Sequence, residues 1–203
     1  EFLRLQLLID KGYHPLAYRL MCLAAHYRSE LEFSWEGLGA ALTRLKRMVM
    51  AVEQLKARLP GEGMDPEAMG PGLRRGDDWG KLQPALDKFD AAIADDLNTA
   101  VALTALDDVL AAKKVDHEVK ANLATAMDAV LGLNLLNLTR ADLRIRPKTA
   151  TITEAEIEAA LARRKEARAA KDFAASDAIR DDLAAQGVEV MDGDPLGWEW
   201  KLG

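Results

Sequence analysis

The sequence predicts a mainly α-helical protein, in which an antiparallel helical bundle is followed by a small module of two helices and a β-hairpin. Two observations carry this prediction. Leucine and alanine recur at the three- and four-residue spacing of a helix over most of the 203 residues. Near the end, 188–191 and 198–201 instead alternate with the two-residue period of a strand, and a turn-rich stretch separates them.

Two helices are predicted in the first part of the chain. Pro15 suits the first turn of a helix that continues to about His26, because proline is well tolerated at that position. Ser34 is a good N-cap for a second helix that continues to Leu59. The buried face of this second helix is predicted to hold six apolar side chains: Leu38, Leu42, Leu45, Met48, Val52 and Leu55.

The stretch 60–80 differs in composition from the helices around it. It contains six of the 14 glycines and three of the seven prolines, which predicts a long, mobile loop. Three helices joined by short turns are predicted after the loop, as in an antiparallel bundle. They cover Leu82–Ala94, a segment from Asn98 or Thr99 to about Ala112, and Asp116–Leu131, where Gly132 provides the stop.

A domain boundary is predicted over the polar, arginine-containing stretch 133–150. Thr153 and Glu156 then have the spacing of a capping box, which begins a helix that ends near Lys171. A further helix is predicted from about Ala174 to Gln186. The predicted organisation is a helical bundle over 14–132 that includes the loop 60–80, a linker over 133–150, and a C-terminal module over 151–203.

Composition excludes several classes of site. The only cysteine, Cys22, rules out a disulfide framework and a cysteine-based zinc site within this chain, and the three histidines are too scattered to predict a metal site. No nucleophile and base are spaced as a catalytic pair, so no catalytic residue is predicted. Charged residues interrupt every apolar run, so no membrane span is predicted either.

Two short polar clusters each allow two interpretations. Asp95 and Asp96 could form a metal or acid–base pair, but together with Asn98 they are more typical of residues that end one helix and cap the next. The segment His26-Tyr27-Arg28 could face a partner, or could stabilise the C-terminal end of the preceding helix.

The net charge of −6 argues against nucleic-acid binding, but the charge is unevenly distributed. It is +3 over 1–59, −4 over 60–150 and −5 over 151–203. Within the acidic last part, five basic residues fall in nine positions of one predicted helix: Arg163, Arg164, Lys165, Arg168 and Lys171. They form either a solvated helix face or a contact with RNA phosphates. Likewise, Phe173, Trp198 and Trp200 are either rings that stack on bases or members of the core.

Several segments, in order along the chain, resemble those of the cysteinyl-tRNA synthetases (cysteine–tRNA ligases), a class I aminoacyl-tRNA synthetase family. Residues 15–19 resemble the Asp-Ala-Leu-Arg signature of helical anticodon-binding regions, and the run 12–34 resembles this family more specifically. Residues 95–99 resemble a central motif, although Ala100 stands where proline is usual. The stretches 168–183 and 187–192 resemble the C-terminal module. The resemblance covers essentially the whole chain.

The resemblance implies that the chain is the tRNA-binding C-terminal half of such an enzyme, with a bundle of the class I anticodon-binding type. Residues 1–13 would then be a remnant of the stem-contact region that follows the ATP-motif loop, and the absence of an initial methionine fits a piece of a longer protein. ATP and zinc are expected in the full-length enzyme, with no cofactor in this part, which is expected to be inactive alone. The expected location is cytoplasmic. The expected partners are tRNA(Cys) and the enzyme's own catalytic domain, with no DNA or membrane.

The resemblance also implies roles for individual residues. Three of them would read the GCA anticodon: Arg168, Asp177 and Asp192. The basic helix and the rings near it add candidates for contact with the tRNA backbone or for stacking, namely Arg163, Arg164, Lys171, Phe173 and Trp200; of these, the resemblance supports Phe173, at a position where tryptophan is common. Candidates for a domain interface or a further tRNA contact are His26, Tyr27 and Arg28. The turn after Asp192 is one residue longer than is usual in the family.

Two alternative functions remain. One is the related cysteine ligase of mycothiol synthesis, which does not use tRNA; the resemblance over 168–192 argues against it. The other is a helical module that only packs on another protein, for which RNA binding would show no dependence on salt.

Overall fold

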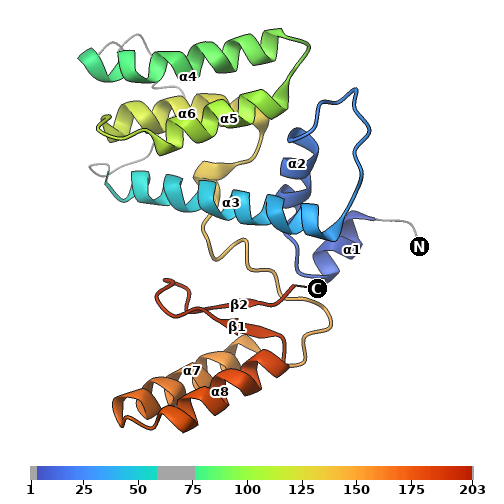
Figure 1. Ribbon diagram of the computed structural model, residues 1–203, viewed down its shortest axis with the longest axis vertical. Coiled ribbons are helices and arrows are strands. Elements are labelled where there is room, and N and C mark those ends of the chain that lie inside the picture. Colours follow the sequence, from blue (N-terminus) through green and yellow to red (C-terminus); the bar gives the residue numbers. More distant parts are fainter. Residues whose placement is uncertain (1–3, 59–75, 203) are drawn as a thin grey trace. The chain divides into compact units, whose positions relative to one another are not determined.

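The computed structural model describes residues 4–58 and 76–202 and is mainly helical, with a two-stranded antiparallel sheet near the end of the chain (Figure 1). The predicted fold class is therefore confirmed. The chain forms two compact units. The bundle unit is Leu16–Arg140, and the terminal unit combines Glu1–Pro15 with Ala141–Gly203. No helix within 4–58 and 76–202 is both long and apolar enough to cross a bilayer.

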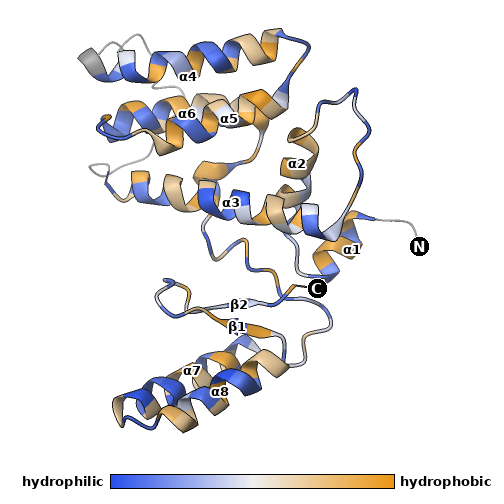
Figure 2. Cartoon of the chain, viewed as in Figure 1, coloured by the Kyte–Doolittle hydropathy of each residue, from blue (hydrophilic) through white to orange (hydrophobic). Residues whose placement is uncertain are grey.

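The bundle unit consists of helices that pack side by side, and both hydrophobic and hydrophilic residues occur along each of them (Figure 2). Helix α4 packs along α5, α5 along α6, and α3 against both α5 and α6. The elements are α2 (Pro15–Leu23), α3 (Trp35–Lys56), α4 (Gly76–Ala94), α5 (Thr99–Ala111), α6 (His117–Leu131) and a 3-10 helix, η3 (Leu135–Asn137).

Local capping signals correctly predicted where most of these helices begin and end. The side chain of Ser34 accepts a hydrogen bond from the Gly37 N–H at the start of α3, and Asn98 and Asp116 cap α5 and α6 in the same way. Gly132 ends α6 with a left-handed backbone (φ 65°). All six residues predicted for the buried face of α3 are buried. Helix α2 ends at Leu23 and α3 at Lys56, each three residues earlier than predicted.

Helix α4 begins at Gly76 rather than near Leu82, so that Pro84 lies inside the helix. Asp78 accepts hydrogen bonds from the Lys81 ammonium at 2.6 Å and from the Asp116 backbone N–H at 3.1 Å. The Asp116 contact, together with the hydrogen bond from the Lys81 ammonium to the Lys114 carbonyl at 2.8 Å, holds the first turns of α4 against the segment that precedes α6, which local sequence signals could not indicate. Most of the predicted loop over 60–80 lies outside the described residues, and its last five positions belong to α4.

The residues after α6 pack more closely than a polar linker would. Leu133, Leu135 and Leu138 are all buried. The buried carboxylate of Asp128 accepts hydrogen bonds from the backbone N–H groups of Leu133 (2.8 Å) and Leu135 (2.7 Å). Burial raises the pKa of Asp128, while these hydrogen bonds act in the opposite direction. The stretch predicted as a linker, 133–150, is divided between the two units after Arg140.

The terminal unit contains the predicted helical pair and hairpin. These are α7 (Glu154–Ala169), α8 (Phe173–Ala185), β1 (Val188–Val190) and β2 (Trp198–Trp200). Thr153 and Glu156 form both hydrogen bonds of the predicted capping box. The strands are antiparallel, with Val188 opposite Trp200 and Val190 opposite Trp198.

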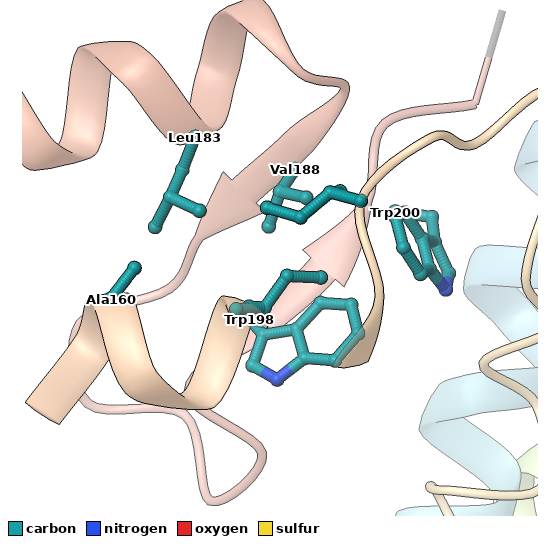
Figure 3. Packing of buried hydrophobic residues seen from close by; sticks show 7 residues of the cluster. Ala160, Leu183, Val188, Trp198 and Trp200 are labelled. Carbon is teal, nitrogen blue, oxygen red and sulfur yellow. The ribbon is translucent and has the colours of Figure 1, made fainter. Parts of the chain in front are cut away.

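The core of the terminal unit lies between the hairpin and the two helices. Figure 3 shows Ala160, Leu183 and Val188 packed with Trp198 and Trp200. The two indole rings meet edge to face with their centroids 5.1 Å apart. The Trp198 Nε1–H donates to Glu158 at 2.8 Å, and the Arg144 guanidinium lies 3.7 Å from the centroid of the Trp198 ring. The tryptophans therefore hold the hairpin on α7.

Residues near the start of the chain form part of this same unit. Helix α1 (Leu5–Asp10) is followed by Gly12, which has a left-handed backbone (φ +93°) and neighbours that leave no space for a side chain. An added Cβ would lie 2.9 Å from Pro147 Cγ and 3.0 Å from the Ile145 carbonyl oxygen. The Lys148 N–H donates to the Asp10 carbonyl at 2.7 Å. The segment predicted as a remnant thus packs on residues just before the C-terminal module.

Candidate nucleic-acid interface

An ion pair that is buried only at its arginine end joins the basic helix α7 to the turn that follows β1. Arg164 Nη1 donates to Asp192 Oδ1 at 2.7 Å, and Arg164 Nη2 donates to Asp192 Oδ2 at 2.9 Å. The Arg164 side chain is 9% exposed, whereas that of Asp192 is 58% exposed. Each carboxylate oxygen thus receives one N–H from the guanidinium, in the parallel geometry that makes arginine–carboxylate pairs strong and directional.

A second arginine reaches the same carboxylate. Arg168, one helical turn beyond Arg164, places Nη1 3.2 Å from Asp192 Oδ1, and half of its side chain is exposed. The hydrogen bond from Arg164, followed by the charges of both arginines, lowers the pKa of Asp192 to about 2. The same hydrogen bond raises the pKa of Arg164. The Asp192 carboxylate and the Arg164 guanidinium therefore remain ionised over the physiological pH range. We call Arg164, Asp192 and Arg168 together the Arg–Asp–Arg cluster.

An open hollow of about 410 Å³ lies beside the cluster. This volume is typical of sites that receive small ligands or parts of larger ones. The turn backbone at its edge is tightly hydrogen-bonded, with Met191 donating to the Gly197 carbonyl at 2.9 Å. Gly193 (φ 87°) and Gly197 (φ 71°) allow the turn its left-handed positions. The hollow is lined by the Arg–Asp–Arg cluster, Lys165, residues 190–191 and 193–194, Leu161 and Gly197.

Helix α8 brings two further predicted residues to this unit. Asp177 is exposed and lies 3.5 Å from Arg180 Nη1, and its charge also acts on Arg164. Phe173, the first residue of α8, is 63% exposed, so its ring is open to a stacking partner. Lys171 precedes it with a left-handed backbone (φ 60°) and is exposed.

Two of the residues predicted to contact the tRNA backbone or to stack on its bases are buried in the structure. Trp200 is only 4% exposed because its ring packs in the core of the terminal unit, so it cannot stack on a base in this conformation. Arg164 is buried, and both of its terminal nitrogens donate to Asp192. Arg163, by contrast, is exposed on α7. Helical spacing alone predicted that Arg164 is exposed like the other basic residues. Its acidic partner Asp192, 28 residues later, was the one sequence feature that could have indicated a buried arginine instead.

In the bundle unit, His26, Tyr27 and Arg28 gather around Asp96. The Tyr27 hydroxyl donates to Asp96 Oδ1 at 2.6 Å, and Arg28 Nε lies 3.2 Å from Asp96 Oδ2. His26 stacks on Tyr27 with the ring centroids 4.9 Å apart. The hydrogen bond to Asp96 raises the pKa of Tyr27. Asp96 therefore anchors the segment after α2, whereas Asn98 caps α5 as predicted.

Metal ligation finds no support in the described part of the chain. Within 4–58 and 76–202, no three side chains from His, Cys, Asp and Glu lie close enough together to hold a metal ion. The interpretation of Asp95 and Asp96 as an acidic pair for a metal thus gains no third ligand there.

The lowered pKa of Asp192 predicts a pH-dependent contribution to stability. Because the folded pKa of about 2 lies below the ordinary value of 3.8, this contribution is complete above about pH 4 and is lost as the pH falls towards 2. For a side chain this exposed, we expect a contribution of about 1 kcal/mol to the free energy of unfolding. Urea unfolding of the chain and of Asp192→Asn should show a stability difference that shrinks by that amount between pH 5 and pH 2. In an Arg164→Met background the shrinkage should become smaller, because only Arg168 then remains beside the carboxylate; an undiminished shrinkage would mean that Arg164 is not its main cause.

Comparison with known proteins assigns this region. Residues 153–195 match the family described as "Cysteinyl-tRNA ligase anticodon binding domain". The match spans the Arg–Asp–Arg cluster, Phe173 and Asp177, and with the helical pair and its basic helix it defines the class: the anticodon-binding domain of an aminoacyl-tRNA ligase.

The whole chain is similar to cysteine–tRNA ligases. It is 68% identical over 202 residues to the cysteine–tRNA ligase of Novosphingobium aromaticivorans, covering 100% of this chain and 38% of that protein. It is 47% identical over 220 residues to the cysteine–tRNA ligase of Zymomonas mobilis, covering 99% of this chain and 43% of that protein. Cysteine–tRNA ligase 1 of Burkholderia lata is 37% identical over 193 residues, with 95% of this chain and 35% of the relative covered. The chain belongs to the cysteine–tRNA ligase family and corresponds to the C-terminal part, about two-fifths, of these relatives.

Proposed function

We propose that this chain binds tRNA(Cys) and reads its GCA anticodon for an ATP-dependent cysteine–tRNA ligase. The observation that carries the proposal is the Arg–Asp–Arg cluster, which borders an open hollow inside the region matched by the anticodon-binding family. The cluster presents an ionised acceptor and a half-exposed donor side by side. That combination suits the edge of an unpaired base.

The chemistry of each candidate follows from its exposure. Asp192 and Asp177 are exposed carboxylates and can accept hydrogen bonds from the N–H groups of guanine or from the exocyclic amine of cytosine or adenine. Arg168 can donate to the ring nitrogen and carbonyl oxygen of cytosine. The open ring of Phe173 provides a surface on which one unpaired base can stack.

The remaining basic residues supply attraction rather than selectivity. Arg163, Lys165 and Lys171 are exposed around α7 and can contact phosphates. This local concentration of positive charge offers a site for RNA on a chain whose net charge is −6. Reading by carboxylates and attraction by neighbouring cations can therefore coexist in one small module.

The catalytic steps belong, in this proposal, to the rest of the ligase. ATP and zinc would act in its catalytic domain, with which this chain would work as a partner. The chain alone is then expected to lack cysteine-dependent ATP–pyrophosphate exchange. Translation of cytoplasmic messages would place the enzyme in the cytoplasm.

A binding titration tests the proposed function. The chain is titrated with a labelled tRNA(Cys) anticodon stem–loop at several salt concentrations, and with stem–loops in which one anticodon base is replaced. With about three phosphates contacted, log K should fall against log salt with a slope of roughly −2. Each replacement of a base that is read should weaken binding at least about tenfold.

Two outcomes would contradict the proposal. Equal affinity for the GCA and replaced stem–loops would mean that the chain does not read the anticodon. A slope near zero would favour a module that only packs on protein. Pyrophosphate exchange catalysed by the chain alone would overturn the assignment of catalysis to another domain.

A further inference from the structure

Arg164 occupies the core-facing side of α7, unlike its basic neighbours. The buried residues of α7 are Ile157, Ala160 and Arg164, which follow one another at three- and four-residue intervals along one face. Arg163 and Lys165 flank Arg164 but are exposed. A guanidinium at such a position has been taken out of water, and this is tolerated because Asp192 supplies the opposite charge.

The bidentate pair determines how the Asp192 carboxylate is turned. An ionised carboxylate has about four lone-pair positions, and two parallel N–H donors engage both oxygens from the same side. Arg168 approaches Oδ1 from one turn further along α7. The carboxylate, which is more than half exposed, thus has its free acceptor capacity on the side away from Arg164.

We propose that Arg164 is a positioning residue: it contacts no RNA, and it orients the Asp192 carboxylate so that this group selects a base carrying an N–H donor. The proposal rests on the proposed function and adds to it a residue through which a base-reading residue acts. It also assigns Arg164 a role distinct from that of Arg163 and Lys165, which are open to phosphates.

Three roles for Arg164 make different predictions. A phosphate contact changes the affinity for every RNA equally and changes the salt dependence. A purely structural tie between α7 and the turn changes stability but not the ratio of affinities for two RNAs. A positioning residue changes that ratio while the salt dependence stays the same, because the charges remain and only the direction of the acceptor is lost.

Arg164→Lys is the decisive variant, because lysine keeps the charge but cannot form two parallel hydrogen bonds. Dissociation constants are measured for the GCA stem–loop and for stem–loops with each anticodon base replaced, per folded molecule as determined by urea unfolding. For each anticodon position, the ratio is the dissociation constant of the stem–loop replaced there divided by that of the GCA stem–loop. At one position this ratio should be about tenfold lower in Arg164→Lys than in the unmodified chain. The slope of log K against log salt should equal that of the unmodified chain.

Two further variants keep the test interpretable. Asp192→Glu retains the charge but moves the carboxylate by one methylene, and should reduce the ratio at the same anticodon position. Arg163→Lys is the matched control on the exposed side of α7 and should leave every ratio unchanged. If Arg164→Lys destabilised the chain too much for binding studies, Arg164→Gln would replace it, and the ratio at the same anticodon position should fall in the same way.

The outcomes separate the two proposals. If the unmodified chain discriminates between anticodons and Arg164→Lys discriminates equally well, the positioning role is wrong and the proposed function stands. If Arg164→Gln weakens binding to all stem–loops alike and makes the salt slope shallower, Arg164 is a phosphate contact. If the unmodified chain does not discriminate at all, the proposed function falls, and the positioning role falls with it.

Discussion

Replacement of Asp192 by alanine is expected to weaken binding of the tRNA(Cys) anticodon stem–loop about a hundredfold, or roughly 3 kcal/mol. Two losses combine in this variant. The base loses its ionised acceptor, and the Arg164 guanidinium, whose side chain is 9% exposed, is left without its partner. The displaced guanidinium would move, and the turn that Asp192 joins to α7 would move with it.

The sign of this effect distinguishes it from simple electrostatics. Removal of a negative charge near a polyanion should strengthen binding slightly. Glu189 is the matched control, since it is an exposed carboxylate on β1, three residues before Asp192. Glu189→Ala should leave binding unchanged or tighten it slightly, whereas Asp192→Ala should weaken it. Fluorescence anisotropy at one fixed salt concentration measures both, and similar effects for the two variants would contradict the role of Asp192.

Replacement of Gly12 by alanine is expected to lower the free energy of unfolding by about 3 kcal/mol. About 1 kcal/mol comes from the left-handed backbone at φ +93°, which disfavours any residue with a Cβ. The remainder, about 2 kcal/mol, comes from overpacking. The new Cβ would lie 2.7 Å from Leu202 Cδ2, 2.9 Å from Pro147 Cγ and 3.0 Å from the Ile145 carbonyl oxygen. Leu202 can rotate away, but the proline ring and the carbonyl cannot.

Gly187 provides the control for this prediction. Its backbone is also left-handed (φ +80°), but an added Cβ would meet no atom within 4 Å. Gly187→Ala should therefore cost only the conformational part, about 1 kcal/mol. Urea unfolding of the two variants gives the difference. Equal destabilisation would mean that the segment after α1 does not pack closely on residues 145–147 and 202.

The helices illustrate how far local signals reach. Ser34, Asn98 and the Thr153–Glu156 box predicted where three helices begin, because a cap acts on backbone groups within three residues of itself. The start of α4 could not be predicted in this way. Its first turns are held by contacts with the segment before α6, about 35 residues away, to which Asp78 and Lys81 contribute.

The candidate site was likewise predicted only in part from the sequence. Spacing predicted one basic helix through Arg164, Arg168 and Lys171, although α7 ends at Ala169 and Lys171 lies beyond it. The resemblance to a known family pointed to Asp177 and Asp192 as functional companions of this helix. Neither showed that Arg164 is buried and that Trp200 is enclosed in the core. Both facts depend on the hairpin, which folds back on α7 and brings Asp192 and Trp200 against it.

The sequence by itself determined the helical class, most helix ends, the hairpin and the location of the basic helix, because each follows from spacing or capping over a few neighbouring residues. Only the tertiary structure decided which basic side chains are exposed and available for contact with RNA, and that Arg164 is instead buried against a carboxylate. The partners Arg164 and Asp192 lie 28 residues apart. Their pairing requires α7 and the turn after β1 to be brought together by burial of a shared apolar core, and that is a property of the packed unit rather than of any one segment.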